Sequence, residues 1–173
     1  MKVKGYSIWL IPDVGFFHEF CAIIRDLGRK YGAPVFEPHI TLLGQVMGIE
    51  GDLKFKTEQL AKKLKSFPVY FGRYRGEENY FKPLFLEVER SPELIGADKL
   101  ARTIFNIADR VEYQPHLSLV YGLFDKETKN KMEKDLTGKN FAGLCQTVNR
   151  LALYHTEGEV NKWRKVFEIG FDI

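Results

Sequence analysis

Two short stretches with the same residue pattern constrain the fold of this chain most strongly. They are Pro38 to Leu42 and Pro115 to Leu119, and both read proline, histidine, apolar residue, hydroxyl residue, leucine. Because side chains alternate between the two faces of a strand, the histidine and the hydroxyl residue of each stretch share one face. The apolar residues between them point into a core. The sequence therefore predicts two similar strands, one in each half of the chain.

The residue patterns around these stretches predict an α+β protein. Apolar spacing of three to four residues indicates helices, and we place them at 17–31, 52–66, 92–108 and 126–136. Short β-rich runs indicate strands, and we place them at 6–11, 35–46, 67–74, 80–89 and 114–123, with three more towards the C-terminus. No low-complexity linker divides the chain. We expect residues 1–173 to form a single bilobal domain, with two antiparallel-rich sheets, flanking helices and pseudo-two-fold symmetry around a central cleft.

The paired histidines and hydroxyl residues suggest acid–base chemistry on a phosphodiester. Hydrolysis of a cyclic phosphodiester needs a base that activates water and an acid that protonates the departing sugar oxygen. His39 and His116 suit both tasks, because the usual imidazole pKa of about 6.5 makes both protonation states accessible near neutrality. The hydroxyls of Thr41 and Ser118 are placed to donate hydrogen bonds to the non-bridging phosphate oxygens.

Three other interpretations of the same residues are weaker. A metal site would need a third ligand, but the other two histidines lie outside a ligand-like spacing, so we predict no metal. A serine nucleophile would need an orienting partner, and no Gly-x-Ser-x-Gly motif is present. One such histidine strand would most simply be structural, but two copies in β context favour a functional pair.

Composition and charge narrow the class of partner. The net charge of +3 is compatible with a phosphate-bearing ligand and falls short of the basic stripe of a duplex-binding protein. Cys21 and Cys145 are far apart and form no Cys-x-x-Cys pair, which favours a reducing, cytoplasmic setting. The N-terminal residues lack the apolar run of a signal peptide. No apolar stretch approaches the roughly 20 residues of a membrane span, so we expect no membrane association.

The two motifs resemble those of the 2H phosphoesterase superfamily. His39 to Leu42 and His116 to Leu119 match its His-x-Thr/Ser-x signatures in the expected order. Within that superfamily the chain is most similar to the cyclic phosphodiesterases of the plant and yeast type. Their opening strand resembles residues 6–12, and their second motif with its trailing tyrosine resembles residues 115–122.

This resemblance implies a function and roles for the motif residues. It implies metal-independent opening of nucleoside 2′,3′-cyclic phosphates, or of ADP-ribose 1″,2″-cyclic phosphate, with a 2′-phosphate product and no cofactor. His39 and His116 would be the acid–base pair, with His116 as the base and His39 as the acid in hydrolysis. Thr41 and Ser118 would be the phosphate ligands.

The resemblance also suggests two substrate contacts outside the motif pairs. Tyr121 would contact the substrate, although simple alternation places it on the face opposite His116, so this role requires a bulge or a strand end near Val120. Trp9 would stack on the base or ribose of the substrate.

Two alternative functions remain open at this stage. RNA 2′,3′-cyclic phosphodiesterases of the same superfamily act on RNA ends and often carry an arginine-rich tract near the second motif. Here Leu123, Phe124 and Asp125 follow that motif, which favours a small cyclic-phosphate nucleotide as the partner. The other alternative is a nucleotide-binding module without turnover, for which two titratable imidazoles are unnecessary. We expect the protein to be a monomer.

Overall fold

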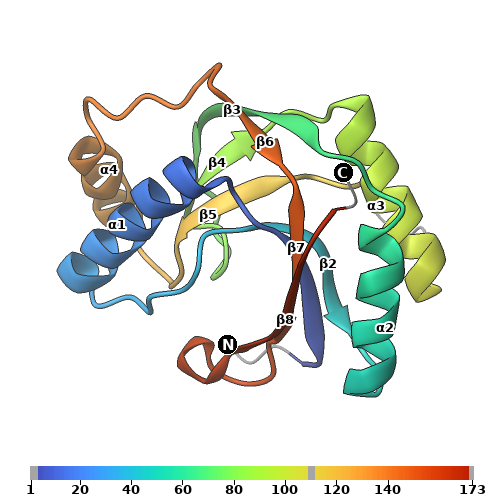
Figure 1. Ribbon diagram of the computed structural model, residues 1–173. Coiled ribbons are helices and arrows are strands. Elements are labelled where there is room, and N and C mark those ends of the chain that lie inside the picture. Colours follow the sequence, from blue (N-terminus) through green and yellow to red (C-terminus); the bar gives the residue numbers. More distant parts are fainter. Residues whose placement is uncertain (1–3, 109–111, 172–173) are drawn as a thin grey trace.

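The computed structural model describes residues 4–108 and 112–171, which form helices and strands in the predicted α+β pattern (Figure 1). Three short segments lie outside the described residues. Residues 1–3 and 172–173 are part of the single-domain prediction, and residues 1–3 are also part of the signal-peptide prediction. Residues 109–111 are part of the predicted link between the third helix and the second histidine strand. The helices are α1 (Val14–Tyr31), α2 (Glu50–Ala61), α3 (Pro92–Phe105) and α4 (Lys126–Asp135). The strands are β1 (Tyr6–Leu10), β2 (Ile40–Val46), β3 (Phe67–Arg75), β4 (Leu84–Val88), β5 (His116–Val120), β6 (Cys145–Val148), β7 (Arg150–His155) and β8 (Arg164–Gly170), with a short 3-10 helix, η1 (Val160–Lys162), before β8.

The strands form one eight-stranded sheet in the order β6-β3-β4-β5-β2-β1-β7-β8, and every paired neighbour is antiparallel. The α+β class and the antiparallel strands are therefore confirmed. The two sheets expected from the sequence are the two four-stranded halves of this one sheet, β6-β3-β4-β5 and β2-β1-β7-β8. The innermost strands, β2 and β5, carry the two histidine motifs and meet where Ile40 lies opposite Leu117.

The helices lock the two halves together. Helix α1 packs on β5 of the other half, and α3 packs on β2 in return. Helix α2 packs on β7, β8 and α3, and α4 packs on β4. Figure 1 shows α1 beside α4 on one side of the sheet and α2 beside α3 on the other. Within the described residues, no helix combines the length and the hydropathy needed to cross a membrane.

Capping explains where α1 begins and ends. The Asp13 side chain accepts a hydrogen bond of 3.1 Å from the backbone N–H of Phe16, so α1 begins at Val14, three residues earlier than its apolar spacing predicts. Gly32 ends α1 with a φ of 66°, a left-handed conformation that glycine adopts without strain. Helix α2 begins at Glu50 rather than at Asp52.

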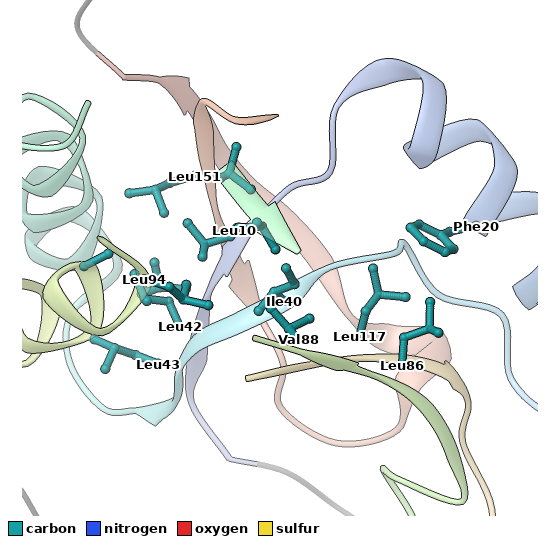
Figure 2. Close-up of a cluster of buried hydrophobic side chains, with 14 of the residues drawn as sticks. Leu10, Phe20, Ile40, Leu42, Leu43, Leu86, Val88, Leu94, Leu117 and Leu151 are labelled. Atoms are coloured by element: carbon teal, nitrogen blue, oxygen red, sulfur yellow. The ribbon is translucent and has the colours of Figure 1, made fainter. Parts of the chain in front are cut away.

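The apolar residues of both motifs lie in the main core, as the alternating pattern predicts. Ile40, Leu42 and Leu117 are almost completely buried. In Figure 2 they lie close to apolar side chains from both halves of the sheet and from two helices, including Leu10, Phe20, Leu86, Val88, Leu94 and Leu151. This core fixes the inward face of β2 and β5, so the histidines and hydroxyls of the motifs take the opposite face.

We predict that Leu117→Ala lowers the free energy of unfolding by about 2–5 kcal/mol, because it leaves a cavity where the two halves of the sheet meet. The matched control is Leu123→Ala, at a position three residues after the end of β5. The side chain of Leu117 is 0% exposed and that of Leu123 is 79% exposed. The control should therefore change stability by less than about 0.5 kcal/mol. Urea titration of the three proteins gives both values, and equal effects would contradict the assignment of the junction as core.

Candidate active site

A cavity of about 230 Å³ lies on the motif face of the sheet, where its two halves meet. The structure brings all six residues predicted from the sequence to the lining of this cavity: Trp9, His39, Thr41, His116, Ser118 and Tyr121. One comes from residue 9, two from the first motif at residues 39–41 and three from the second motif region at residues 116–121. The sheet order explains this, because β1 lies next to β2 and β2 lies next to β5.

The two imidazoles are held in the same way by the backbone. Nδ1 of His39 lies 2.6 Å from the carbonyl oxygen of Glu37, and Nδ1 of His116 lies 3.0 Å from that of Gln114. Because a carbonyl oxygen only accepts hydrogen bonds, Nδ1 is the protonated nitrogen in each ring. Each neutral ring therefore keeps the lone pair of Nε2 for proton exchange. One hydrogen-bond pattern thus fixes one tautomer at both sites.

The prolines of the two motifs account for this shared pattern. Pro38 and Pro115 lie between each histidine and the carbonyl that it contacts. Proline fixes its own φ near −65° and restricts the preceding residue to extended conformations. The carbonyl two residues before each histidine is therefore presented in a restricted orientation. The sequence pattern contains these prolines, but their effect on the histidine tautomer becomes evident only from the structure.

His39 is enclosed by aromatic rings. The Trp9 indole stacks on the imidazole, with 3.5 Å between ring centroids and 5° between the ring planes. Tyr154 stacks on Trp9 at 3.8 Å and 23°, which places it on the opposite face of the indole. Both faces of Trp9 are therefore occupied, and neither is offered to a nucleobase. Trp9 thus packs against the His39 ring, and its role as a substrate contact stays a prediction.

Burial changes the acidity of both histidines. The His39 residue is only 5% exposed, and this burial lowers its pKa to about 3, against the opposing effect of the hydrogen bond to Glu37. Burial also lowers the pKa of His116, and the nearby ammonium of Lys82 adds to the effect. Both imidazoles are therefore neutral near pH 7 in the free protein. His116 is less buried than His39, so the two sites differ in how much they disfavour a proton.

A β-bulge brings Tyr121 to the cavity. On β4, Phe85 pairs with Ser118 and the neighbouring Leu84 pairs with Val120, so β5 has one extra residue between them. Leu119 and Val120 consequently both lie in the core, and the next residue returns to the motif face. The phenol of Tyr121 lies 3.4 Å from Nε2 of His39, and its burial raises the pKa of the phenol. Tyr121 is therefore neutral and can donate to His39.

The first motif has the same bulge but ends differently. On β1, Trp9 pairs with Thr41 and Ile8 pairs with Leu43, again leaving one extra residue on the motif strand. Two successive leucines face the core, and the residue that returns to the cavity is Gly44. Gly44 thus occupies the position that Tyr121 occupies in the second motif. One motif supplies a phenol at this position, and the other leaves space.

The hydroxyls of the two motifs are in different situations. The Ser118 hydroxyl is buried and donates a hydrogen bond of 2.7 Å to the carbonyl oxygen of Phe81. The Thr41 side chain lines the cavity and is only partly buried, while its own carbonyl accepts a 3.0 Å hydrogen bond from the Tyr113 phenol. The hydroxyl proton of Ser118 thus points to the turn before β4. At Thr41 it is the backbone carbonyl, and not the hydroxyl, that makes the hydrogen bond.

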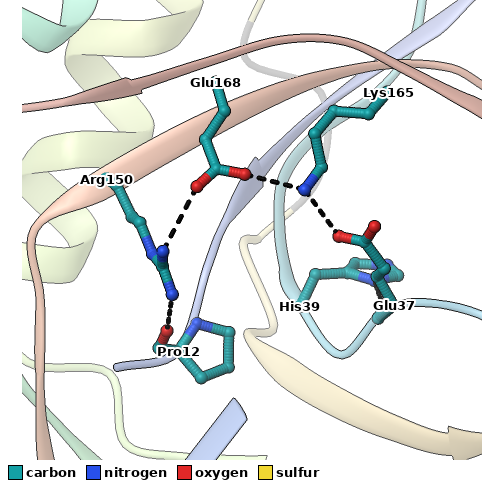
Figure 3. Close-up of polar contacts among 6 residues, drawn as sticks. All are labelled: Pro12, Glu37, His39, Arg150, Lys165 and Glu168. Carbon is teal, nitrogen blue, oxygen red and sulfur yellow. Dashed lines mark hydrogen bonds and ion pairs between the residues drawn. The ribbon is translucent and has the colours of Figure 1, made fainter. Parts of the chain in front are cut away.

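A chain of charged side chains lies behind His39 (Figure 3). The carboxylate of Glu37 pairs with Nζ of Lys165 at 2.9 Å, and Lys165 also pairs with Glu168 at 2.7 Å. Glu168 in turn accepts from Arg150 at 3.2 Å, and Arg150 donates a 2.9 Å hydrogen bond to the carbonyl of Pro12. This chain connects Pro12, just after β1, and strands β7 and β8 to the residue whose carbonyl orients His39. The second motif has Gln114 in place of Glu37.

The turn before β4 supplies cavity residues that the sequence did not reveal. The predicted strand at 80–89 is wrong at its start, since β4 begins at Leu84 and residues 80–83 belong to a turn. This turn is tied to the second motif, because the N–H of Gly122 donates to the carbonyl of Tyr80 at 2.8 Å. Asn79, Phe81 and Lys82 line the cavity as a result. No motif marks these residues, so only the tertiary structure identifies them.

No group of three or more His, Cys, Asp or Glu side chains placed to hold a metal ion occurs among the described residues. Among these described residues, the lining of the cavity includes the two motif histidines and no carboxylate. The polar groups that line the cavity thus include two neutral imidazoles, four aliphatic hydroxyls, one phenol, two amides and one lysine.

Comparisons with known proteins identify the family and the fold. The model of a family described as cyclic phosphodiesterase-like protein matches residues 3–171. The cyclic phosphodiesterase of Arabidopsis thaliana is 31% identical over 161 residues, which cover 92% of this chain and 89% of that protein. A 2′,3′-cyclic-nucleotide 3′-phosphodiesterase of Yarrowia lipolytica is 25% identical over 207 residues, covering 92% of this chain and 96% of that protein.

Solved structures show the same fold at low sequence identity. E. coli LigT complexed with 3′-AMP has a TM-score of 0.61 and 14% identity, covering 98% of this chain and 99% of that chain. TT0787 of Thermus thermophilus has a TM-score of 0.63 and 13% identity, covering 99% of this chain and 98% of that chain. The curled antiparallel sheet with paired histidine motifs defines a 2H phosphoesterase. The chain belongs to the cyclic phosphodiesterase-like family and is a phosphodiesterase.

We predict that acid destabilises the wild type more than His39→Gln. The folded-state pKa of His39 is about 3, against about 6.5 in the unfolded chain, so below pH 6.5 the unfolded state binds a proton that the native state does not. Stability is therefore lost as the pH falls. Between pH 7 and pH 5 the wild type should lose about 2 kcal/mol more than the variant.

Urea titrations at both pH values measure this difference. His18→Gln, at an exposed position on α1, serves as the control and should lose as much stability as the wild type. Equal losses for wild type and His39→Gln would show that His39 is protonated in the folded protein.

Proposed function

We propose that this protein opens nucleoside 2′,3′-cyclic phosphates by metal-independent, two-histidine acid–base catalysis. The observation that carries the proposal is the matched pair of imidazoles, each held at Nδ1 by a backbone carbonyl and each lining the same cavity. In an in-line hydrolysis, water attacks phosphorus opposite the P–O bond that breaks, so a base for the water and an acid for the leaving sugar oxygen are needed on opposite sides of phosphorus. His39 and His116 come from opposite halves of the sheet, which suits this requirement.

His116 acts as the base and His39 as the acid for ring opening. The deeper burial of His39 makes its imidazolium the stronger acid, so it gives up a proton to the departing oxygen more readily. His116 is less buried and is the stronger base of the pair, within reach of solvent water. A bound phosphodiester anion favours the protonated form of His39 by its charge, so the proton is taken up with the substrate.

Thr41 and Ser118 bind the non-bridging phosphate oxygens. Ser118 does so after its hydroxyl proton turns from the Phe81 carbonyl into the cavity. Tyr121 donates from its phenol beside Nε2 of His39 and contacts the same phosphate group. Trp9 contributes by holding the His39 ring rather than by stacking on the nucleoside.

The product is a 2′-phosphate. This choice is supported by the yeast relative, whose name, 2′,3′-cyclic-nucleotide 3′-phosphodiesterase, denotes cleavage at the 3′ position. ADP-ribose 1″,2″-cyclic phosphate is the second substrate in this proposal, because it presents the same five-membered cyclic phosphodiester. The monomeric state, the cytoplasmic setting and the absence of a cofactor stay predictions.

RNA ends that carry a 2′,3′-cyclic phosphate are the second candidate substrate. A groove of about 650 Å³ runs from His116 along β3 and β4 and could hold further nucleotides. Most of its cations are paired with carboxylates, however: Arg75 pairs with Glu87 at 2.9 Å, and Arg90 pairs with Glu112. Paired arginines are less available to a phosphate backbone than free ones. The groove therefore favours a small nucleotide over a longer RNA.

We predict that wild-type protein hydrolyses 2′,3′-cyclic AMP in excess EDTA, and that His39→Ala or His116→Ala lowers kcat by about 10²–10⁴-fold. Each substitution removes one of the two proton-transfer groups while the other remains. Product separation by chromatography measures rate and regiochemistry together. Loss of wild-type activity in EDTA would indicate a metal site, and tight 2′-AMP binding without turnover would indicate a binding module.

We predict that kcat/KM falls as the pH rises above about 6.5, by up to tenfold per pH unit. The reason is that kcat/KM reports the free enzyme, in which burial lowers the pKa of both histidines and one of them must be protonated to act as the acid. Initial rates from pH 5 to pH 9 give the profile. A rate that rises steadily with pH would exclude an imidazolium acid.

We predict that a cyclic-phosphate mononucleotide has a higher kcat/KM than an oligoribonucleotide with the same 3′ end. The near balance of charge in the adjoining groove gives the longer substrate no additional attraction. Measuring both substrates at two salt concentrations tests this. A strong, salt-sensitive preference for the oligomer would establish RNA ends as the substrate.

A further inference from the structure

The cavity has to compensate the charge of an anion. A cyclic phosphodiester carries one negative charge, and moving it out of water is costly unless a cation or several hydrogen bonds replace its hydration. Both histidines are neutral in the free protein, so they supply no fixed charge. Among the described residues that line the cavity, Lys82 is the one with a permanent charge at neutral pH.

Lys82 is built into the cavity wall. Its side chain is 18% exposed, and it lines both the cavity and the groove that begins at His116. The backbone around it is fixed, because its carbonyl accepts a 2.8 Å hydrogen bond from the N–H of Glu77 and its N–H donates to the carbonyl of Asn79 at 3.1 Å. The turn therefore presents the ammonium from a defined position rather than from a free surface side chain.

The partner of this ammonium is a carboxylate at the rim. Nζ of Lys82 lies 2.8 Å and 2.7 Å from the two carboxylate oxygens of Glu77. The Glu77 side chain is 44% exposed, more than twice the fraction for Lys82. A carboxylate in this position can turn into water at small cost, while the lysine stays beside the cavity.

We propose that Lys82 binds the substrate phosphate and that Glu77 is a resident counter-ion which the phosphate displaces. This inference rests on the proposed function and adds to it a binding residue outside the two histidine motifs. Glu77 keeps the ammonium paired while the cavity is empty, and the phosphate takes over the pairing when it binds. Because the two anions compete for one cation, removing Glu77 and removing Lys82 have opposite effects on phosphate affinity.

The same two residues act on His116 with opposite sign. The Lys82 ammonium lowers the pKa of His116, and the Glu77 carboxylate raises it. Replacement of Glu77 by the phosphate therefore keeps a negative charge near Lys82 throughout the reaction. This geometry places the charge that holds the phosphate next to the base that activates water.

The test measures the affinity of 2′-AMP and of inorganic phosphate for the intact protein by calorimetry. Lys82→Met should weaken 2′-AMP binding by about 10- to 100-fold, because a hydrogen bond to a charged group is lost. Glu77→Gln should tighten it several-fold. In the double variant Lys82→Met/Glu77→Gln, the gain from Glu77→Gln should vanish, because no cation remains to be released.

The matched control is Lys129→Met. Lys129 contacts the same turn, with Nζ 3.4 Å from the carbonyl of Glu77, but it does not line the cavity. This variant should bind 2′-AMP within twofold of the wild type. NMR titration of the His116 ring gives a second readout, with the pKa raised in Lys82→Met, lowered in Glu77→Gln and unchanged in the control.

Two results would overturn the proposal. If Glu77→Gln weakens binding as much as Lys82→Met, the ion pair is a structural brace of the turn. If Lys82→Met binds 2′-AMP within twofold of the wild type, the phosphate does not contact the ammonium. Failure of the proposed function looks different: cyclic phosphates are then not hydrolysed by the wild type, whereas the opposite effects of the two variants on 2′-AMP binding persist.

Discussion

The pairing of β2 with β5 is the contact on which the site depends. These strands lie at the centre of the sheet and meet at Ile40 and Leu117, both completely buried. The residue before Ile40 and the residue before Leu117 are the two histidines. Burying one apolar pair therefore sets the separation of two imidazoles from distant parts of the chain. The crossed packing of α1 on β5 and α3 on β2 makes this junction hard to open without disrupting both halves.

The junction places the histidines, and the backbone determines their chemistry. Each Nδ1 is bound to a carbonyl two residues earlier, so each Nε2 is available for proton exchange. Behind Glu37 a chain of ion pairs and hydrogen bonds runs through Lys165, Glu168 and Arg150 to Pro12, just after β1. Removing the Lys165 charge would leave the Glu37 carboxylate without its partner in a half-buried position, which is costly. The first motif is therefore braced from three strands.

The sequence was sufficient to predict whatever depends on local periodicity. The period of two placed His39 with Thr41 and His116 with Ser118 on one face, and the apolar residues between them are in the core. The class of fold follows from the same patterns. Contacts between segments that lie far apart in the sequence could not be predicted from this periodicity. The bulges that bring Tyr121 into the cavity depend on strand register, and Trp9 stacks on a ring from another strand. Lys82 lies in a turn without any motif, so its place beside His116 is visible only in the folded protein.

The two motifs are similar in sequence but differ in their surroundings, and the difference suits their chemistry. His39 is buried beneath Trp9 and beside Tyr121, and this burial lowers its pKa, so its proton is held weakly. His116 lies at the mouth of a solvent-filled groove and beside Lys82. A pair of identical imidazoles in identical surroundings would titrate together and would rarely hold one proton in the right place. Unequal burial separates the two pKa values, which would let one ring serve as the acid and the other as the base in the proposed mechanism. In the proposed mechanism, the asymmetry that Gly44 and Tyr121 introduce after the shared bulge is thus part of how a repeated motif would perform two different proton transfers.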